Sequence, residues 1–550
     1  MKEKNKKTIN KKSVIFDVLA IICIILFCMA ISPVTMQNDT YYTVKVGETI
    51  VQNGIDGMDH FSWHENLNYE YPHWLYDVIM YFIYNMGGWT GIYISTLVFT
   101  SILGIILYIT NKKICKNQIV PFVLTIASIF LIKSYIAARA QLVTFILFVL
   151  EVFFIEKFIK NRKIGYALGL LSISLLIANL HVAVWPFFFV LFLPYIAEYL
   201  VCAIVDLDLI LRLKKLAYII KKKIFFKNEE KIKIIEEKII NIDNQREKIK
   251  QKREENRKHP YKIKIERNKN IKYLILVMLI AALLGLCTPL GKTPYTYLID
   301  TMQGNTTKNI NEHLPLTLID QKDILGLLII VIALLMLTDI KIKLRDLFMF
   351  GGLVILTLMS RRQISMLILI GMPIYCKLIL AFLKKYKCMQ DVKQILKEMT
   401  GLYGFCITLC IFIIVCTNIY KPKLDDKYVD ESSYPVQACD YILENLDISN
   451  MRIYNEYNYG SYMLYRGIPV FIDSRADLYT PEFNSGCTVF DDFLNISNIG
   501  TYYENKFEEY NITHVICFKN AKLNMFLSRN YEYKELYSDD RFVIYERDVA

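Results

Sequence analysis

Residues 13–36, SVIFDVLAIICIILFCMAISPVTM, determine the class of fold. After Asp17 this stretch contains no charged residue, and as a helix it is long enough to cross a hydrocarbon layer of roughly 30 Å. In lipid only helices and closed barrels satisfy their own backbone groups. Six lysines precede the stretch, which predicts a cytoplasmic N-terminus. No small-residue cleavage site follows, so we expect a retained signal-anchor helix.

Ten further apolar stretches follow the first. Hydrophobic residues make up 54% of the chain and the mean hydropathy is +0.30, which indicates an α-helical polytopic membrane protein. We expect about eleven transmembrane helices, at residues 13–36, 89–110, 119–132, 142–158, 165–179, 182–205, 271–287, 323–338, 347–359, 364–383 and 401–420. The turns that this assignment places inside are rich in Lys and Arg, so the orientation in the plasma membrane is consistent.

The net charge of +12 is concentrated in one segment. Residues 206–270 contain 21 Lys or Arg against 11 Asp or Glu, an excess of 10. No nucleic-acid-binding motif accompanies this excess, which favours a cytoplasmic segment beside anionic membrane lipids over a nucleic-acid surface. The mixture of Lys, Glu and Ile without Gly predicts long amphipathic helices. We therefore expect a basic helical insert between two transmembrane modules, residues 1–205 and 271–420.

Residues 421–550 have the composition of a soluble domain. The pattern predicts a helix and four strands, which is typical of a small α/β domain, at residues 434–446 and at 451–454, 470–473, 514–518 and 542–546. Because the last apolar stretch leads outward, we expect this domain to be extracytoplasmic. The thirteen cysteines lie mostly in apolar stretches and lack metal-like spacing, so we expect neither a disulfide framework nor a zinc site.

The polar segment 37–85 concentrates reactive side chains. We expect it to be an outer loop of the catalytic type, with a helix in the membrane interface at 73–85. Asp39 directly follows the first span, so its carboxylate is a candidate general base; a helix-end or turn-forming aspartate is the alternative. Four side chains of the segment could hold a divalent metal, although no two of them lie at helical spacing on a clear helix: Asp59, His60, His64 and His73.

Three arginines lie at predicted outer ends of spans, against the positive-inside pattern: Arg139, Arg361 and Arg362. An arginine within apolar surroundings costs about 2.5–3.5 kcal/mol on insertion scales, so such a residue usually faces a cavity or a partner. Its planar guanidinium suits a phosphate; bonding to helix carbonyls or lipid phosphates is the alternative. We select Arg139 and Arg361 as phosphate ligands, and the further substrate-binding candidates are Asp59, His73, His181 and Glu312.

The tail motif NEYNYGSYMLYRGIPVFIDSRADLY, residues 455–479, places three charged residues after a predicted strand: Asp473, Arg475 and Asp477. The carboxyl end of a strand is a common place for a ligand in α/β sheets. A salt bridge from Arg475 to either aspartate, which would fasten the loop, is the interpretation that we favour.

Several motifs together resemble the GT-C superfamily of integral-membrane glycosyltransferases, which use polyprenyl-phosphate sugars, and more closely a bacterial membrane-protein group of that type. They are DTYYTVKVGETIVQNGI (39–55), ARAQLVTFILF (138–148), NLHVAVWPFF (179–188), TPLG (288–291), SRRQISMLIL (360–369) and the tail motif. The resemblance covers nearly the whole chain except residues 206–270. It implies a catalytic Asp at Asp39 and outer-face arginines at Arg139 and Arg361. Two departures are that no second acidic residue pairs with Asp39, which leaves metal use open, and that Ala140 stands where related chains often have Pro.

The resemblance implies an inverting sugar transfer at the outer face of the membrane. Asp39 would deprotonate an acceptor hydroxyl, and Arg139 or Arg361 would stabilise the leaving polyprenyl phosphate. The acceptor is left open as a glycan, a protein or a lipid. The alternatives are a non-enzymatic transporter or flippase for lipid-linked cell-envelope glycans, and an assembly protein. A transporter needs ionisable residues within its spans, whereas the charges of this chain are expected to collect at outer span ends.

Overall fold

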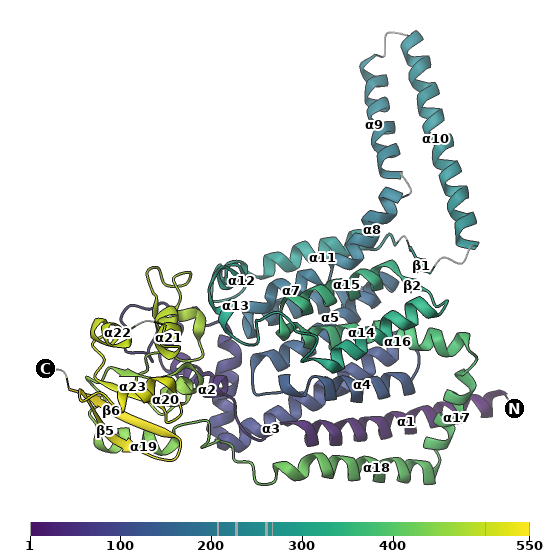
Figure 1. Ribbon diagram of the computed structural model, residues 1–550. Helices are drawn as coiled ribbons and strands as arrows, with labels where there is room; N and C mark the ends of the chain where they lie inside the picture. The colour runs from purple at the N-terminus through teal and green to yellow at the C-terminus, as the bar shows by residue number, and fades with distance from the viewer. Residues whose placement is uncertain are drawn as a thin grey trace.

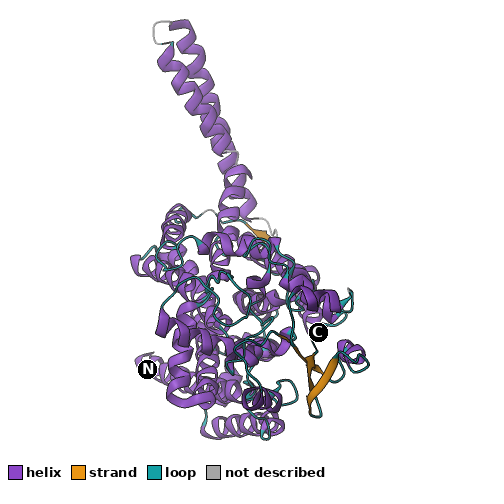
Figure 2. Cartoon of the chain, turned by 90° about the vertical axis from the view of Figure 1, so that its left-hand side faces the viewer, coloured by secondary structure: helices purple, strands orange, loops and turns teal. Residues whose placement is uncertain are grey.

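The apolar helices form one bundle, and a mixed domain lies at one end of it. The computed structural model describes residues 2–205, 208–225, 229–258, 262–266, 268–500 and 502–548. In Figure 1 the bundle helices run in roughly one direction, with the N-terminus at one end and the C-terminal domain at the other. Figure 2 views the molecule from the side of the C-terminal domain and shows that the strands are few and lie in two separate places.

All eleven predicted apolar ranges overlap helices. The bundle comprises α1 (Lys2–Ile31), α3 (Trp74–Cys115), α4 (Ile119–Leu131), α5 (Ala140–Asn161), α6 (Ile164–Leu180), α7 (Trp185–Val190), α8 (Leu193–Val205), α11 (Ile271–Leu284), α14 (Lys322–Leu337), α15 (Leu344–Met359), α16 (Ile364–Lys385) and α18 (Leu402–Tyr420). Among the described residues, five segments are long and apolar enough to cross a membrane: Lys12–Ile31, Trp74–Cys115, Val182–Cys202, Arg361–Lys385 and Leu402–Lys423. These features are those of a helical membrane protein, whereas the count of eleven crossings is not confirmed.

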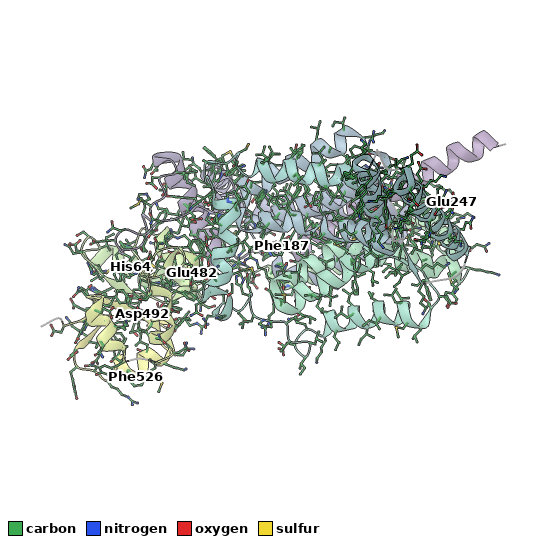
Figure 3. The ribbon with its side chains drawn as sticks, turned by 90° about the horizontal axis from the view of Figure 1, so that it is seen from above. His64, Phe187, Glu247, Glu482, Asp492 and Phe526 are labelled. Carbon is green, nitrogen blue, oxygen red and sulfur yellow. The ribbon has the colours of Figure 1, made fainter. Side chains whose placement is uncertain are left out.

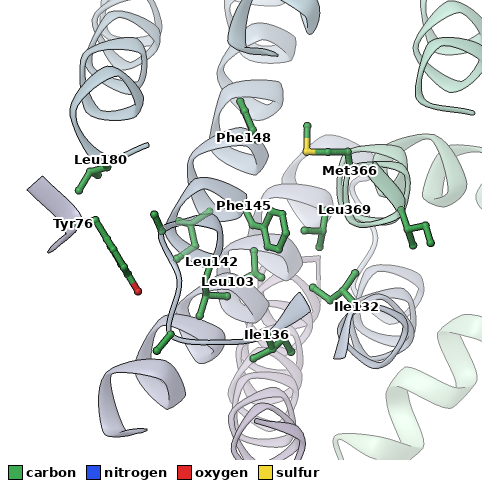
Figure 4. Packing of buried hydrophobic residues seen from close by; sticks show 14 of the residues in the cluster. Tyr76, Leu103, Ile132, Ile136, Leu142, Phe145, Phe148, Leu180, Met366 and Leu369 are labelled. Atoms are coloured by element: carbon green, nitrogen blue, oxygen red, sulfur yellow. The ribbon is translucent and has the colours of Figure 1, made fainter. Parts of the chain in front are cut away.

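The core of the bundle lies where α3, α4, α5 and α16 meet. Figure 4 shows Leu103 of α3, Phe145 of α5 and Leu369 of α16 converging on one another, with Ile132 at the end of α4 beside them. All four side chains are buried. Between helices in lipid, close packing rather than exclusion from water stabilises such contacts. The packing fixes the start of α5 and the start of α16 relative to each other, and both starts carry arginines.

The polar segment 37–85, predicted as an outer loop with a helix at 73–85, begins with a further helix that was not predicted. Helix α2 (Asn38–Asn53) packs against α3 and against α20 (Tyr457–Tyr465) of the C-terminal domain. At the closest approach of α2 to α3, a Cβ on Gly47 would lie 2.1 Å from the carbonyl oxygen of Asp77. The Thr, Tyr and Val residues of α2 have modest helix propensity, and tertiary packing overrides it.

The expected interfacial helix and the second span form one continuous element, α3, with a kink between them. Gly88 has φ 57° inside this helix, a left-handed conformation that glycine adopts without a steric penalty. The kink lies at the Gly87-Gly88 pair that separates the two predicted segments. The first turns of α3 therefore have a direction of their own, and they carry Asp77 towards α2.

A four-stranded mixed sheet organises the C-terminal domain. Its order is β3 (Ile453–Tyr454), β4 (His514–Phe518), β6 (Phe542–Arg547) and β5 (Tyr533–Ser538), and its helices are α19 (Val436–Asn445), α20, α21 (Val489–Ser497), α22 (Tyr503–Glu509) and α23 (Lys522–Leu527). The predicted strand 470–473 is wrong, because Val470 forms only an isolated bridge with Ser62. The prediction missed β5, an edge strand whose residues are mostly exposed or half-exposed.

The remaining elements lie at the two ends of the bundle. Beside the C-terminal domain are α12 (Thr293–Gln303) and α13 (Thr306–Asn309). At the other end lie α17 (Met389–Met399) and a two-stranded pairing of β1 (Ile263–Lys264) with β2 (Ile342–Lys343). The basic insert contains two long helices, α9 (Asp208–Ile224) and α10 (Glu229–Lys258), that pack against each other and project from the bundle (Figure 1).

Candidate active site

A cavity of about 790 Å³ lies where the bundle meets the C-terminal domain. Its volume is within the range of roughly 300–1,000 Å³ that is usual for ligand pockets. The wall combines residues from α2, the start of α5, the turn after α6, the segment 301–313 and the tail segment 457–497. Five of the seven site residues selected from the sequence line it: Asp39, His73, Arg139, His181 and Glu312.

Arg139 joins two carboxylates in this cavity. Its Nη2 lies 2.8 Å from Oδ2 of Asp39, and its Nη1 lies 2.8 Å from Oε1 of Glu312. The side chains of Arg139 and Asp39 are each 25% exposed and that of Glu312 is 43% exposed, so a ligand can reach all three. Burial alone would raise the pKa of Glu312, but Arg139 lowers it below its usual range. The group therefore brings two carboxyl groups and one guanidinium together at the cavity wall.

The second oxygen of Asp39 is available to a ligand. No hydrogen bond from the described part of the chain reaches Oδ1 of Asp39, whereas Oδ2 is held by Arg139. Asp39 belongs to the first turn of α2, where the partial positive charge of the helix N-terminus favours a carboxylate. The structure thus orients one oxygen of Asp39 and leaves the other for a hydroxyl donor.

His73 is held in a chain of three polar groups. Its Nδ1 lies 2.7 Å from Oδ1 of Asp77, which is fully buried, and its Nε2 lies 2.9 Å from the hydroxyl of Tyr42. Burial by itself would lower the pKa of His73, but the Asp77 carboxylate raises it above the usual value. Sequence analysis did not select Asp77 or Tyr42, although the spacing of His73 and Asp77 is that of neighbours on a helical turn.

Thr144 holds the ring of His181. The hydroxyl oxygen of Thr144 lies 3.0 Å from the carbonyl oxygen of Ala140 and 3.0 Å from Nδ1 of His181. His181 lines the cavity and is buried. Its ring can therefore offer one hydrogen-bonding nitrogen to Thr144 and the other to a ligand.

Arg362 lines the cavity, whereas the selected Arg361 does not. Arg361 turns away and donates to Asn311 Oδ1 at 2.9 Å and Thr317 Oγ1 at 3.0 Å. Arg362 lines the cavity, and its guanidinium has no hydrogen bond or ion pair with any described residue. Burial and this guanidinium lower the pKa of His313 to about 4. Arg361 and Arg362 belong to a 3₁₀ turn, Arg361–Gln363. Consecutive side chains of such a turn point about 120° apart, so the two arginines point in different directions.

Asp59 lies outside the cavity, in a buried cluster around Arg475. Nη1 of Arg475 lies 2.7 Å from Oδ1 of Asp59, and its Nη2 lies 2.7 Å from Oδ2 of Asp473. The three side chains are at most 2% exposed. Burial alone would raise the pKa of Asp59, but Arg475 lowers it. Asp59 therefore fastens segment 37–85 to the tail, and the predicted salt bridge of Arg475 to Asp473 is present.

The two remaining histidines of the segment also hold structure together. His64 Nε2 lies 2.8 Å from the carbonyl oxygen of Phe471, and Figure 3 places His64 within the C-terminal domain, away from the cavity residue Phe187. His60 pairs with Asp56 at 2.7 Å near the surface. In the part of the chain that the structure describes, no group of three or more His, Cys, Asp or Glu residues is arranged to hold a metal ion, so the residues that were candidates for a metal do not come together.

Two acidic residues that sequence analysis did not select complete the cavity. Asp477, from the tail motif, accepts hydrogen bonds from Tyr297 at 2.9 Å and from Thr301 and Thr306 at 3.1 Å, and burial raises its pKa. Glu70 lines the wall beside it. Four buried polar atoms of the lining residues have no hydrogen-bond partner among the residues that the structure describes: Asn38 Oδ1, Tyr69 OH, Glu70 Oε2 and Arg139 Nε. Such atoms are costly unless a ligand or water pairs with them.

Comparison with known proteins adds no further information about the site. No protein-family model matches the chain, and no curated protein matches it significantly.

Proposed function

We propose that the protein is a GT-C-type membrane glycosyltransferase that transfers a sugar from a polyprenyl-phosphate donor to an acceptor at the outer face of the plasma membrane. The observation that carries the proposal is the cavity, in which Asp39, Arg139 and the unpaired Arg362 lie together at one end of an apolar bundle. Unpartnered polar atoms in its wall suit the many hydroxyls of a sugar.

Asp39 is the general base in this proposal. Its Oδ1 accepts the proton of an acceptor hydroxyl while the hydroxyl oxygen attacks the anomeric carbon of the donor sugar. The bond between that carbon and the phosphate oxygen breaks, the bonding pair leaves with the phosphate, and the configuration inverts. The ion pair with Arg139 fixes the orientation of Asp39. General-base catalysis of this kind contributes roughly 10²–10⁴ in rate.

Arg362 and Arg139 bind the donor phosphate. Arg362 has no partner among the described residues, so it can bind an anion without breaking an existing ion pair. Arg139 must exchange Glu312 for the phosphate, or bind it through the unpartnered Nε. Charge-assisted bonds of this kind contribute about 1.5–3 kcal/mol each. They strengthen as the leaving phosphate gains charge, which is when they accelerate the reaction.

The proposal includes a topology. Eleven crossings, with a cytoplasmic N-terminus, place the cavity and the C-terminal domain on the outer side, where no nucleotide sugar is available. The donor is then a lipid-linked sugar that reaches the cavity from the membrane, and the acceptor is a glycan, a protein or a lipid of the cell envelope. His73, His181 and Glu312 bind hydroxyl or amide groups of these substrates.

The test is sugar transfer by purified protein from polyprenyl-phosphate sugars to a cell-envelope glycan extract. We expect Asp39→Asn to lower the transfer rate by about 10²-fold or more while it leaves donor affinity within about threefold. Asp425→Asn is the matched control, because Asp425 is exposed and does not line the cavity. Transfer by Asp39→Asn at the rate of the control would refute the role of Asp39, and the absence of transfer by any donor would refute the proposed activity.

One observation favours a second function, a transporter of lipid-linked glycans. Glu151 of α5 is fully buried, and neither of its carboxyl oxygens has a hydrogen-bond partner in the described part of the chain. Further along the bundle, Lys377 lies 3.2 Å from Glu156 and 2.9 Å from Asp346. Charges therefore do not collect only at the outer ends of helices, and the expectation to that effect is wrong. Ionisable groups within spans are common in transport pathways.

A flipping measurement separates the two functions. The movement of a lipid-linked glycan across proteoliposomes would be followed with Glu151→Gln and, as a control on the exposed surface, Glu444→Gln. A transporter predicts movement that Glu151→Gln abolishes and Asp39→Asn leaves intact. The transferase predicts no movement that depends on Glu151.

A further inference from the structure

Helix α9 of the basic insert carries an apolar stripe that the proposed function does not use. The stripe consists of Leu209, Leu213, Leu216, Ile220 and Ile224, which recur at intervals of three or four residues and so share one helical face. Each of these side chains is between 46% and 65% exposed. A continuous apolar surface of this kind indicates a binding surface.

The stripe lies on the side of α9 that faces away from α10. On the opposite side Leu211 is buried, Lys215 Nζ lies 2.6 Å from Asp243 Oδ2, and Lys222 Nζ lies 2.5 Å from Glu236 Oε1. These contacts hold the two helices together and fix the rotation of α9. The partner helix therefore leaves the stripe uncovered.

Positive charge borders the stripe on both sides. Helical spacing places Lys214 and Lys221 along one border and Lys223 along the other, and none of the three makes an ion pair with a described residue. Helix α9 has six Lys or Arg against one Asp, whereas the longer α10 has ten against eight. An apolar face flanked by lysines is the pattern of a helix that lies in the interface of an anionic bilayer.

The arrangement of the hairpin agrees with this pattern. In Figure 1 the hairpin runs across the direction of the bundle helices, as a segment on a membrane surface does, and α9 is the helix on the side towards which the bundle extends. Seen from above, Glu247 of α10 lies at the end of the bundle opposite the C-terminal domain (Figure 3). The apolar stripe thus faces the layer that the bundle crosses, and the more polar α10 faces away from it.

We propose that α9 lies in the membrane interface at the N-terminal end of the bundle, with its apolar stripe inserted and its lysines on anionic lipid headgroups, while α10 remains on the water side. This inference depends on the insert alone, so it stands or fails separately from the proposed enzymatic activity.

Tryptophan quenching in the full chain tests the inference. Leu216→Trp on the stripe and Glu237→Trp on the exposed surface of α10 would be reconstituted into nanodiscs of brominated phosphatidylcholine, with or without phosphatidylglycerol. Emission of the parent chain, which has four tryptophans, is subtracted. We expect the tryptophan at position 216 to be blue-shifted and to lose about half of its intensity or more, because the stripe reaches roughly 5–10 Å into the interface. The tryptophan at position 237 should change little.

Charge reversal tests the preference for anionic lipid. The triple variant Lys214→Glu, Lys221→Glu, Lys223→Glu should reduce quenching at position 216 in phosphatidylglycerol, whereas reversal of Lys233, Lys248 and Lys250 on α10 should have little effect. Equal quenching at positions 216 and 237 would overturn the inference. A blue shift at position 216 that depends on protein concentration and not on the presence of lipid would also overturn it, because it would indicate that a second copy of the chain covers the stripe. Quenching that is insensitive to the triple variant and to phosphatidylglycerol would overturn the anionic preference.

Discussion

Arg139 and Arg475 are each held between two carboxylates, but they differ in exposure. Arg139 pairs with Asp39 and Glu312 in the cavity, where the side chains are 25–43% exposed, whereas the cluster of Arg475 with Asp59 and Asp473 is at most 2% exposed. Each group consists of one guanidinium and two carboxyl groups at similar distances. Although Arg475 also lines the cavity, the exposed side chains of the first group are the ones that an incoming anion can reach.

The difference shows how one polar segment serves two purposes. Its first helix brings Asp39 to the cavity, and the part from Asp56 to His64 fastens the bundle to the C-terminal domain. In the second part Trp63 Nε1 donates to the carbonyl oxygen of Ile453 at 3.0 Å, and the backbone of Phe61 pairs with that of Val470. A reactive residue type in an outer segment is therefore not by itself evidence of chemistry; accessibility to a ligand distinguishes the two clusters.

Removing the central arginine should have its largest effect in the buried cluster. Arg475→Met leaves two buried carboxylates without a partner, so we expect a loss of about 3–5 kcal/mol in the free energy of unfolding. Arg139→Met leaves carboxylates that water can reach, and we expect a loss of about 1 kcal/mol or less. Thermal unfolding of the purified full-length variants measures both losses. Equal losses would show that exposure does not separate the two groups.

Removing one carboxylate should have opposite consequences in the two groups. Glu312→Gln frees Nη1 of Arg139 for the donor phosphate, so we expect donor affinity to increase by about 1 kcal/mol, roughly fivefold. Asp473→Asn removes a carboxyl partner from buried Arg475 and should lower stability without changing the affinity of the folded protein. Isothermal titration with polyprenyl phosphate measures the donor affinity of both variants, and thermal unfolding measures their stability. Weaker donor binding by Glu312→Gln would contradict the exchange of partners at Arg139.

The pH dependence of stability should separate the buried cluster from Glu456 of the same domain. Arg475 lowers the pKa of Asp59, so the contribution of this ion pair is present above the unfolded pKa and is lost only as pH falls through the folded one. Burial raises the pKa of Glu456 to about 7, so its protonated form stabilises the fold, and stability decreases as pH rises from the ordinary glutamate pKa of about 4.3 to about 7, with no further decrease above it. We expect Glu456→Gln to remove about 1 kcal/mol or more of this decrease. Thermal unfolding at about pH 5 and about pH 7.5 measures it, with the exposed Glu444→Gln as control; an unchanged pH dependence would contradict the assignment.

Composition and periodicity predicted the apolar helices well, because each depends on local sequence. They also predicted Asp39, Arg139 and Glu312 at the same ends of the apolar helices. Residues at the same end of a bundle lie close to one another, and these three line one cavity. The helical state of α2 was not predictable in the same way. Its Thr, Tyr and Val residues lack a clear helical pattern, and contacts with α3 and α20, distant in sequence, decide its structure.

Asp59 and Arg361 were selected from the sequence but do not line the cavity, for different physical reasons. Asp59 lies in the same polar segment as the cavity residues Asp39 and His73. Its partner Arg475 is 416 positions away in the chain, so no local pattern reveals that pairing. Which of Arg361 and Arg362 lines the cavity depends on the rotation of a single 3₁₀ turn. The neighbouring sequence does not determine that rotation. Asp77 was within reach of sequence reasoning, because it lies four residues after His73 on a helix.

The binding of polyprenyl phosphate to variants of these adjacent arginines tests most directly whether exposed, unpaired charge defines the site. Titration of the purified full-length protein in nanodiscs would compare Arg362→Gln with Arg361→Gln. Because the Arg362 guanidinium lines the cavity without a described partner, we expect its loss to weaken binding by about tenfold or more. Loss of Arg361, which is bonded to Asn311 and Thr317, should change binding by less than about twofold. Equal weakening by both variants, or weakening by Arg361→Gln alone, would contradict the account.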